Sequence, residues 1–148
     1  MQRAYSLAVF YYLLFSILLV MSAVLIFETK IGFSINGILD YYLGNEEKYI
    51  LKQSFESILK INLPHLFSFA ALAMVLLHFL VFTKHRFSKR NTILIYATFI
   101  TAFLEIFTPM FIINGFEFFA YLKLLSFFLF LSLVLYISWL LFISIINE

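Results

Sequence analysis

The sequence predicts an all-α integral membrane protein, built as an up-and-down bundle of four membrane-spanning helices. Of its 148 residues, 64% are hydrophobic, and the mean hydropathy is +1.04. Four uninterrupted apolar runs reach the length of about 20 residues that crosses a bilayer as an α-helix. They cover residues 4–27, 63–83, 92–113 and 118–146. So much apolar surface would aggregate in water. We therefore expect one membrane domain over residues 1–148, in contact with the lipid bilayer.

Composition also excludes several classes of protein. The formal charge of +2 is small, and the basic residues cluster in one connection, so nucleic-acid binding has no support. The absence of cysteine excludes disulfides, iron–sulfur clusters and thiolate metal sites. The sequence has no zincin, P-loop or nucleophile-elbow motif. We therefore do not expect an enzyme that works alone.

The basic residues predict how the bundle is oriented. The connection 84–90 carries four lysines and arginines and no acid, which favours the cytoplasmic side. The first run then starts inside, the segment 28–62 lies outside, and both termini are cytoplasmic. The short connections 84–91 and 114–117 predict that the helices they join pack side by side and antiparallel.

The outer segment 28–62 is amphipathic and is expected to carry short interfacial helices. Ser34 can N-cap a helix over 35–43, which Gly44 would end. A second amphipathic stretch, 54–60, leads to Pro64, which we expect at the first turn of the second span. These helices are predicted to lie on the outer membrane surface as an ordered cap.

Several short stretches resemble a group of small four-helix bacterial inner-membrane proteins. They are 41–46 (YYLGNE), 52–55 (KQSF), 65–67 (HLF), Glu105 with Pro109, and 121–123 (YLK). The resemblance covers about two-thirds of the chain and implies a multi-pass protein of the bacterial inner membrane. Members of that group often have a histidine two positions before the HLF stretch, where this chain has Leu63. The resemblance implies an architecture and a location, and no activity.

Four ionisable side chains lie inside the apolar runs: His65, His78, Glu105 and Lys123. A charge at the bilayer centre costs ~2.5–3.5 kcal/mol even on the most lenient scale, so these residues are the first candidates for a site. Glu105, Lys123 and His65 are expected at similar depth in the outer part of the bundle. We predict a Glu105–Lys123 ion pair with His65 as its third member. It would serve either to fix helix register or to handle a proton, an ion or a ligand. The alternative to a pair is that the side chains snorkel to separate wet surfaces.

A polar stripe accompanies Glu105 on the third run. At 100° per residue, Thr98, Thr101 and Thr108 fall on the same side as Glu105. The opposite side carries Tyr96, Phe99, Phe103 and Met110. A polar stripe at membrane depth must face protein or water, so we expect it to face the interior.

The two histidines of the second run suggest haem as an alternative. His65 and His78 are 13 residues apart, one towards each membrane face, a spacing similar to that in multi-haem b-type cytochromes. Imidazole ligates haem iron, so both residues are candidate ligands of haem b. They differ by about 140° on an ideal helix. Each level offers one imidazole, so bis-histidine ligation would need a homodimer or another subunit.

Three functions follow from these features. The first is a non-enzymatic accessory or interaction subunit of a bacterial inner-membrane complex. The alternative is a small b-type electron-transfer protein that uses His65, His78 or both in an oligomer. The weakest is proton or ion handling through Glu105.

Overall fold

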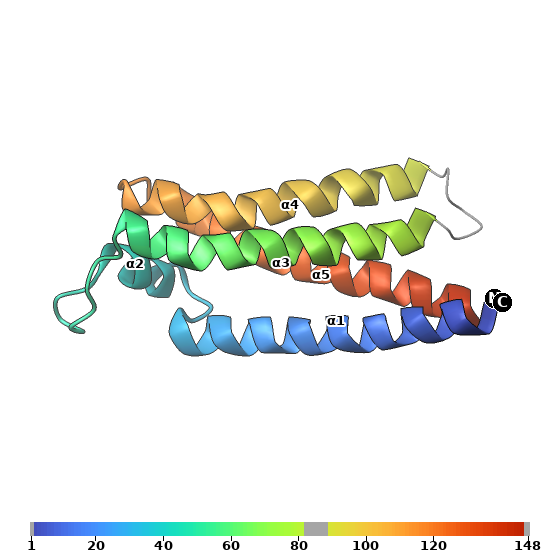
Figure 1. Cartoon of the computed structure of the whole chain (residues 1–148). Helices are drawn as coiled ribbons and strands as arrows, with labels where there is room; N and C mark the ends of the chain where they lie inside the picture. The colour runs from blue at the N-terminus through green and yellow to red at the C-terminus, as the bar shows by residue number, and fades with distance from the viewer. Residues whose placement is uncertain (1, 82–88, 147–148) are drawn as a thin grey trace.

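The computed structural model describes residues 2–81 and 89–146, which form an all-α bundle (Figure 1). In these ranges the helices are α1 (Gln2–Lys30), α2 (Ile35–Leu43), α3 (Phe55–Val81), α4 (Lys89–Ile113) and α5 (Phe118–Ile146). The four long helices α1, α3, α4 and α5 have the length and composition of membrane spans, as the sequence predicts. Both ends of the chain lie at one end of the bundle and α2 lies at the other (Figure 1). These are called the terminal end and the α2 end.

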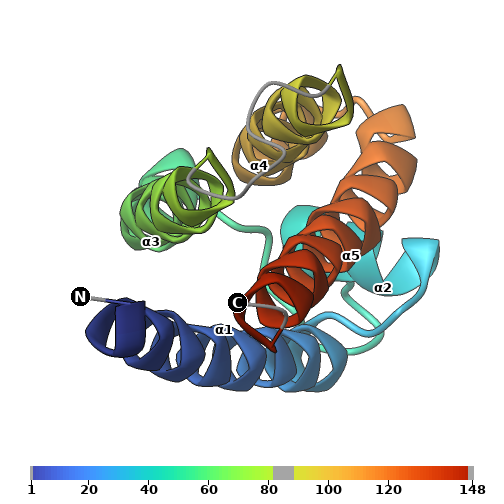
Figure 2. The ribbon, with the colours of Figure 1, turned by 90° about the vertical axis from the view of Figure 1, so that its right-hand side faces the viewer.

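Helices that are joined by short connections pack side by side. α4 packs along both α3 and α5, which confirms the antiparallel neighbours expected from sequence. Figure 2, seen from the terminal end, shows α1 beside α5, with α3 across from them. The residues that α1 buries are Val9, Leu13, Ser16, Val20 and Phe27. Their spacing of three, four and seven residues is that of a single helix face, so α1 is held along one stripe.

The contacts of α1 differ along its length. Near the terminal end the Tyr12 hydroxyl donates to the Leu72 carbonyl of α3 at 3.0 Å, and the Tyr12 and Phe79 rings lie 5.6 Å apart. Near the α2 end the Phe27 ring stacks on Phe127 of α5, with centroids 4.1 Å apart. α1 is therefore joined to α3 at one end and to α5 at the other.

The short helix α2 has the predicted bounds and caps. The Ser34 hydroxyl accepts a hydrogen bond from the Gly37 amide at 3.0 Å. Gly44 ends the helix with a φ of +85°, and a Cβ there would lie 2.7 Å from the Lys52 nitrogen. Ile38 and Tyr42 are buried, and α2 packs against α4 and α5. α2 is therefore packed against the ends of α4 and α5, and is part of the bundle's core as well as a cap.

The second amphipathic stretch is not a separate helix, which corrects the expectation for residues 54–60. Ser54 caps a helix that begins at Phe55, since its hydroxyl accepts from the Ser57 amide at 3.1 Å, and this helix continues without a break to Val81. Pro64 therefore lies inside α3 and not in its first turn. The apolar run marked where the span begins. It could not mark where the helix begins, because the turns of α3 before Asn62 are amphipathic.

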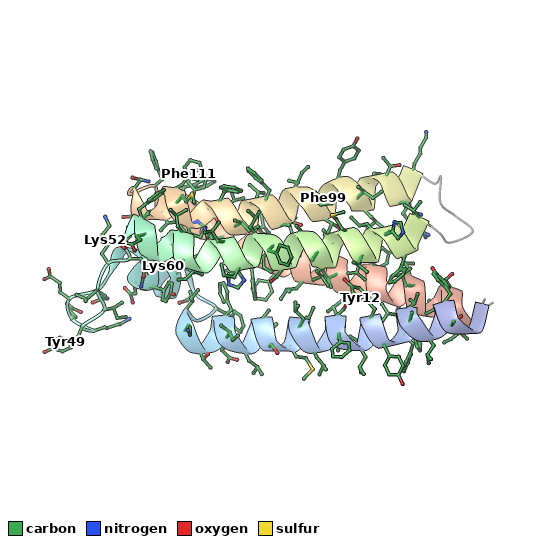
Figure 3. The ribbon with its side chains drawn as sticks, in the orientation of Figure 1. Tyr12, Tyr49, Lys52, Lys60, Phe99 and Phe111 are labelled. Carbon is green, nitrogen blue, oxygen red and sulfur yellow. The ribbon has the colours of Figure 1, made fainter. Side chains whose placement is uncertain are left out.

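The loop between α2 and α3 is closed by local hydrogen bonds. Asn45 and Ile50 exchange backbone hydrogen bonds of 2.8 and 2.9 Å. The Asp40 carboxylate accepts from Lys48 at 2.6 Å and from the Asn45 amide at 2.7 Å. Tyr49, at the tip, is 94% exposed (Figure 3). Of the basic connection on which the predicted orientation depends, residues 84–88 lie outside the described residues.

Candidate functional site

Glu105 of α4 and Lys123 of α5 form the ion pair that the sequence predicts. Both are buried inside the bundle, with 6% and 7% of their surfaces exposed. The Lys123 ammonium donates to Glu105 Oε1 and also to the Glu105 backbone carbonyl, the latter at 2.7 Å. A buried charge is tolerated only when it is paired and hydrogen-bonded, and these contacts satisfy that requirement.

Pro109 explains why the lysine also reaches the backbone. In an α-helix the Glu105 carbonyl would accept from the amide four residues on, which here is Pro109 and carries no N–H. An unsatisfied carbonyl at membrane depth costs several kcal/mol. Lys123 supplies the missing donor, so a single side chain from α5 compensates both the carboxylate and the orphaned carbonyl of α4.

The third member of the cluster is Ser126 and not His65. The Ser126 hydroxyl lies 3.1 Å from Glu105 Oε2 and 3.1 Å from the Lys123 carbonyl. Ser126 follows Lys123 by three residues and is therefore on the same face of α5. Its spacing from Lys123 could have identified it, because side chains three residues apart on a helix are neighbours. His65 lines the same cavity as Glu105 and Lys123, but Ser126 takes the hydrogen bond.

The threonine stripe of α4 faces the interior, as expected. Thr98, Thr101 and Thr108 are buried with Glu105, while Tyr96, Phe99 and Phe103 on the opposite side are exposed. Phe99 and Phe111, both labelled in Figure 3, are 43% and 44% exposed. Met110, expected on that side, is partly buried against the core.

Two of these threonines are satisfied within their own helix. Thr98 donates to the Leu94 carbonyl at 2.7 Å, and Thr101 donates to Ala97 at 2.8 Å. Among the described residues Thr108 Oγ1 has no hydrogen-bond partner. None of the three threonines hydrogen-bonds the Glu105 carboxylate, so the stripe does not form a polar chain through the bundle.

His65 faces an interruption in the core. On α3 it shares a helix face with Ile58, Leu72 and Leu76, at intervals of seven and four residues. All three of those residues are buried, yet His65 is exposed. Its ring lies 5.6 Å from that of Phe69. The imidazole therefore lies on the side of α3 that faces the bundle, and it borders a cavity. Ile58, Leu72 and Leu76 on the same face pack against side chains of the other helices instead.

That cavity has a volume of about 360 Å³ and is lined by every helix of the described chain. Leu19, Ser22 and Lys30 contribute from α1, and Asn62, His65 and Ser68 contribute from α3. Glu105 and Lys123 reach it from α4 and α5, and Tyr41 and Tyr42 from α2. The volume is in the lower part of the ~300–1,000 Å³ range of small-molecule sites.

Asn62 is a polar contributor that the sequence reading missed. Its side-chain amide is buried and donates to the Ile106 carbonyl of α4 at 2.6 Å. This bond ties α3 to α4 one residue from Glu105. The position of Asn62 next to a predicted membrane span could have identified it, because a side-chain amide at membrane depth needs a hydrogen-bond partner.

The structure does not bring the two histidines together. His78 lies near the terminal end of α3, 13 residues from His65 and on a different face. The described residues hold no group of three or more His, Asp or Glu side chains that could bind a metal ion. Haem ligation stays a prediction, and an absorption spectrum of the solubilised protein before and after dithionite reduction tests it. Low-spin haem is expected only in a dimer or larger complex, and His65→Ala or His78→Ala should remove it.

The chain is similar to a known family of membrane proteins over most of its length. Residues 32–148 match the model of a family described as a transmembrane helical domain. This match begins just before α2 and includes the whole polar cluster and His65. No curated protein and no solved structure matches the chain. The family description thus agrees with the four spans of the structure.

Proposed function

The chain belongs to the family of transmembrane helical domains, and from this premise we propose that it is a non-enzymatic accessory or interaction subunit of a larger complex. The bacterial inner membrane is the proposed location, following the resemblance of its short stretches to proteins of that membrane. The proposal has two parts: a structural role for the buried ion pair, and a partner surface on α3.

The observation that carries the proposal is that the polar cluster is closed on itself. Each carboxylate oxygen of Glu105 has a partner, and Lys123 also satisfies the carbonyl freed by Pro109. Because these bonds join α4 to α5, they fix the register and rotation of the two helices. A cluster of this kind holds a bundle in one shape, which suits a protein that presents a fixed surface to a partner.

The partner surface proposed is the side of α3 that faces away from the bundle. Ala70 and Ala71 are exposed there, next to Phe67 and Met74, which are also exposed. Membrane helices associate through small residues, because these let two backbones approach closely. A single membrane helix of another subunit would fit against this face.

Native membranes offer a direct test, because the chain has no cysteine and any introduced one is unique. Ala70→Cys should form a crosslink to a partner of one defined mass. Leu129→Cys, at an exposed position of α5, is the matched control and should not. Ala70→Leu should shift the protein from a larger assembly to a single chain on native gels without changing its thermal midpoint. A single-chain mass for the wild type in mild detergent would overturn the proposal.

Proton or ion handling through Glu105 is the second candidate, favoured because Glu105 and Lys123 line the cavity. Flux into proteoliposomes should then be present and should fall with Glu105→Gln. Flux that does not change with this substitution would exclude it.

A further inference from the structure

The cavity between α1 and α3 has an opening, which its lining residues locate. Ser22 of α1 and His65 and Ser68 of α3 are exposed and also line it. At the terminal end the hydrogen bond from Tyr12 to Leu72 closes the space between these helices. At the α2 end α1 lies against α5 through Phe27 and Phe127. The cavity therefore opens sideways between α1 and α3, towards the bilayer on the α2 side.

Its dimensions match one hydrocarbon chain. Along α1 the lining runs from Leu19 to Lys30, which at ~1.5 Å per residue is roughly 16 Å. One leaflet contributes about 15 Å, half of the ~30 Å hydrocarbon core. Spread over that length, 360 Å³ gives a cross-section of roughly 20 Å². This narrow space suits a slender chain better than a packed helix, which has a diameter of ~10–12 Å.

The lining is mostly apolar, with walls formed by Leu19, Ile26 and Phe69, although Ser22, His65 and Ser68 also border it. Lys30, the last residue of α1, and Tyr41 of α2 lie at the α2 end. An amphiphile entering from the leaflet on that side would place its tail against the walls and its head beside Lys30. Tyrosine and lysine are the residues that meet lipid headgroups at membrane boundaries.

The charges of the lining favour an anion. The carboxylate of Glu105 is already neutralised by Lys123. Lys30 forms no ion pair with any described residue and is the remaining fixed charge of the lining. A headgroup with a phosphate or carboxylate would receive a charge-assisted hydrogen bond from it.

We propose that this cavity binds one chain of an anionic amphiphile, with its acidic headgroup at Lys30 and Tyr41 and its tail between α1 and α3. The site is separate from the partner surface on the far side of α3, so either proposal can fail without the other. The acidic group could come from a phospholipid or from a free fatty acid, and both present the same chemistry to Lys30.

Native mass spectrometry of the detergent-purified chain tests the proposal. It would be titrated separately with phosphatidylglycerol, oleate and phosphatidylcholine. We expect one molecule of the acidic lipid or of oleate to bind at least tenfold more tightly than phosphatidylcholine, and the tighter of the two identifies the source. Lys30→Gln should remove this preference. Lys60→Gln is the matched control, because Lys60 is exposed on α3, pairs with Glu56 and does not line the cavity. It should leave the preference unchanged.

A second variant tests the place of the tail. Ser68→Phe fills the opening from α3 and should abolish binding of both acidic ligands. Circular dichroism would verify that it folds. If it does not, Ser68→Cys replaces it, and its maleimide labelling should slow at least fivefold when the acidic ligand is added. Equal binding of acidic and neutral lipid, equal effects of Lys30→Gln and Lys60→Gln, or labelling unaffected by the ligand would each overturn the proposal.

Discussion

One face of α3 runs along the whole bundle, but its surroundings differ between the terminal half and the α2 half. In the terminal half Leu72, Leu76 and Leu80 are buried against the other helices. In the α2 half the same face presents His65 to a cavity, and Asn62 donates a buried hydrogen bond to α4. On this face of α3 the terminal half packs leucines, although Asn91 and Ser138 are buried elsewhere in the same half, whereas the α2 half combines interhelical polar bonds with a cavity.

The position of α1 explains this difference. Tyr12 ties α1 to α3 in the terminal half, and the Phe27–Phe127 stack holds it against α5 at the other end. In the α2 half α4 and α5 are joined by the ion pair instead of by apolar contacts alone. The comparison teaches that a membrane bundle can leave one helix displaced where hydrogen bonds hold the remaining helices in place.

The largest effect is expected from breaking the ion pair that supports the α2 half. Glu105→Ala leaves Lys123 buried without its carboxylate, which typically costs about 3–5 kcal/mol in the free energy of unfolding. Glu105→Gln should cost less, because its amide oxygen still accepts from Lys123. Unfolding of the detergent-solubilised protein in increasing SDS measures both. An unchanged midpoint in Glu105→Gln and also in Lys123→Met would show that the pair contributes nothing.

Matched truncations of leucine should separate the two halves. Leu76→Ala, in the terminal half where the side chain is fully buried, is expected to cost about 2–5 kcal/mol, because it removes buried methyl groups and leaves a cavity. Leu19→Ala should cost on the order of 1 kcal/mol, because Leu19 already borders empty volume. Urea unfolding of the lipid-free protein in a neutral detergent gives both values, and it is chosen because SDS is itself an anionic amphiphile of the kind proposed to occupy the cavity. Equal losses would mean that Leu19 does not border empty volume in the lipid-free protein.

A smaller effect is expected at the closure between α1 and α3. Tyr12→Phe removes the hydrogen bond to the Leu72 carbonyl and should cost about 0.5–1.5 kcal/mol. Spin labels on α1 and α3 should also report a wider separation in the terminal half. Tyr11→Phe is the control, since Tyr11 is exposed on α1. If the control has the same effect, the Tyr12 bond does not close the cavity.

The smallest effect concerns the loop outside the spans and depends on pH. Hydrogen bonds from Lys48, and then from Asn45, hold the pKa of Asp40 below its usual value. A lowered carboxyl pKa contributes order that is present above the usual pKa and is lost as the pH falls through the lowered value. Amide exchange at residues 45–50 should therefore speed up only in strong acid. In Asp40→Asn the exchange rate, corrected for the intrinsic rate, should no longer depend on pH. If the pH dependence persists in this variant, a group other than Asp40 causes the faster exchange in acid.

The sequence by itself determined the membrane class, the four spans and the identity of the buried pair. Hydrophobic run length and the cost of a charge in hydrocarbon are properties of composition and depth, so they can be read without coordinates. The helix bounds 35–43 followed from the chemistry of Ser34 and Gly44, because capping is local. The orientation in the membrane stays a prediction.

Only the tertiary structure decided the remaining contacts of that pair. The sequence placed His65 at the depth of Glu105, yet Ser126 makes the third contact, because the rotation of α5 brings it within reach of the carboxylate. The carbonyl that Pro109 frees is satisfied from another helix, and the cavity exists because α1 lies against α5 at that level. The relative rotation and displacement of helices depend on contacts summed over the whole bundle, whereas the periodicity of one helix specifies only which side faces inward.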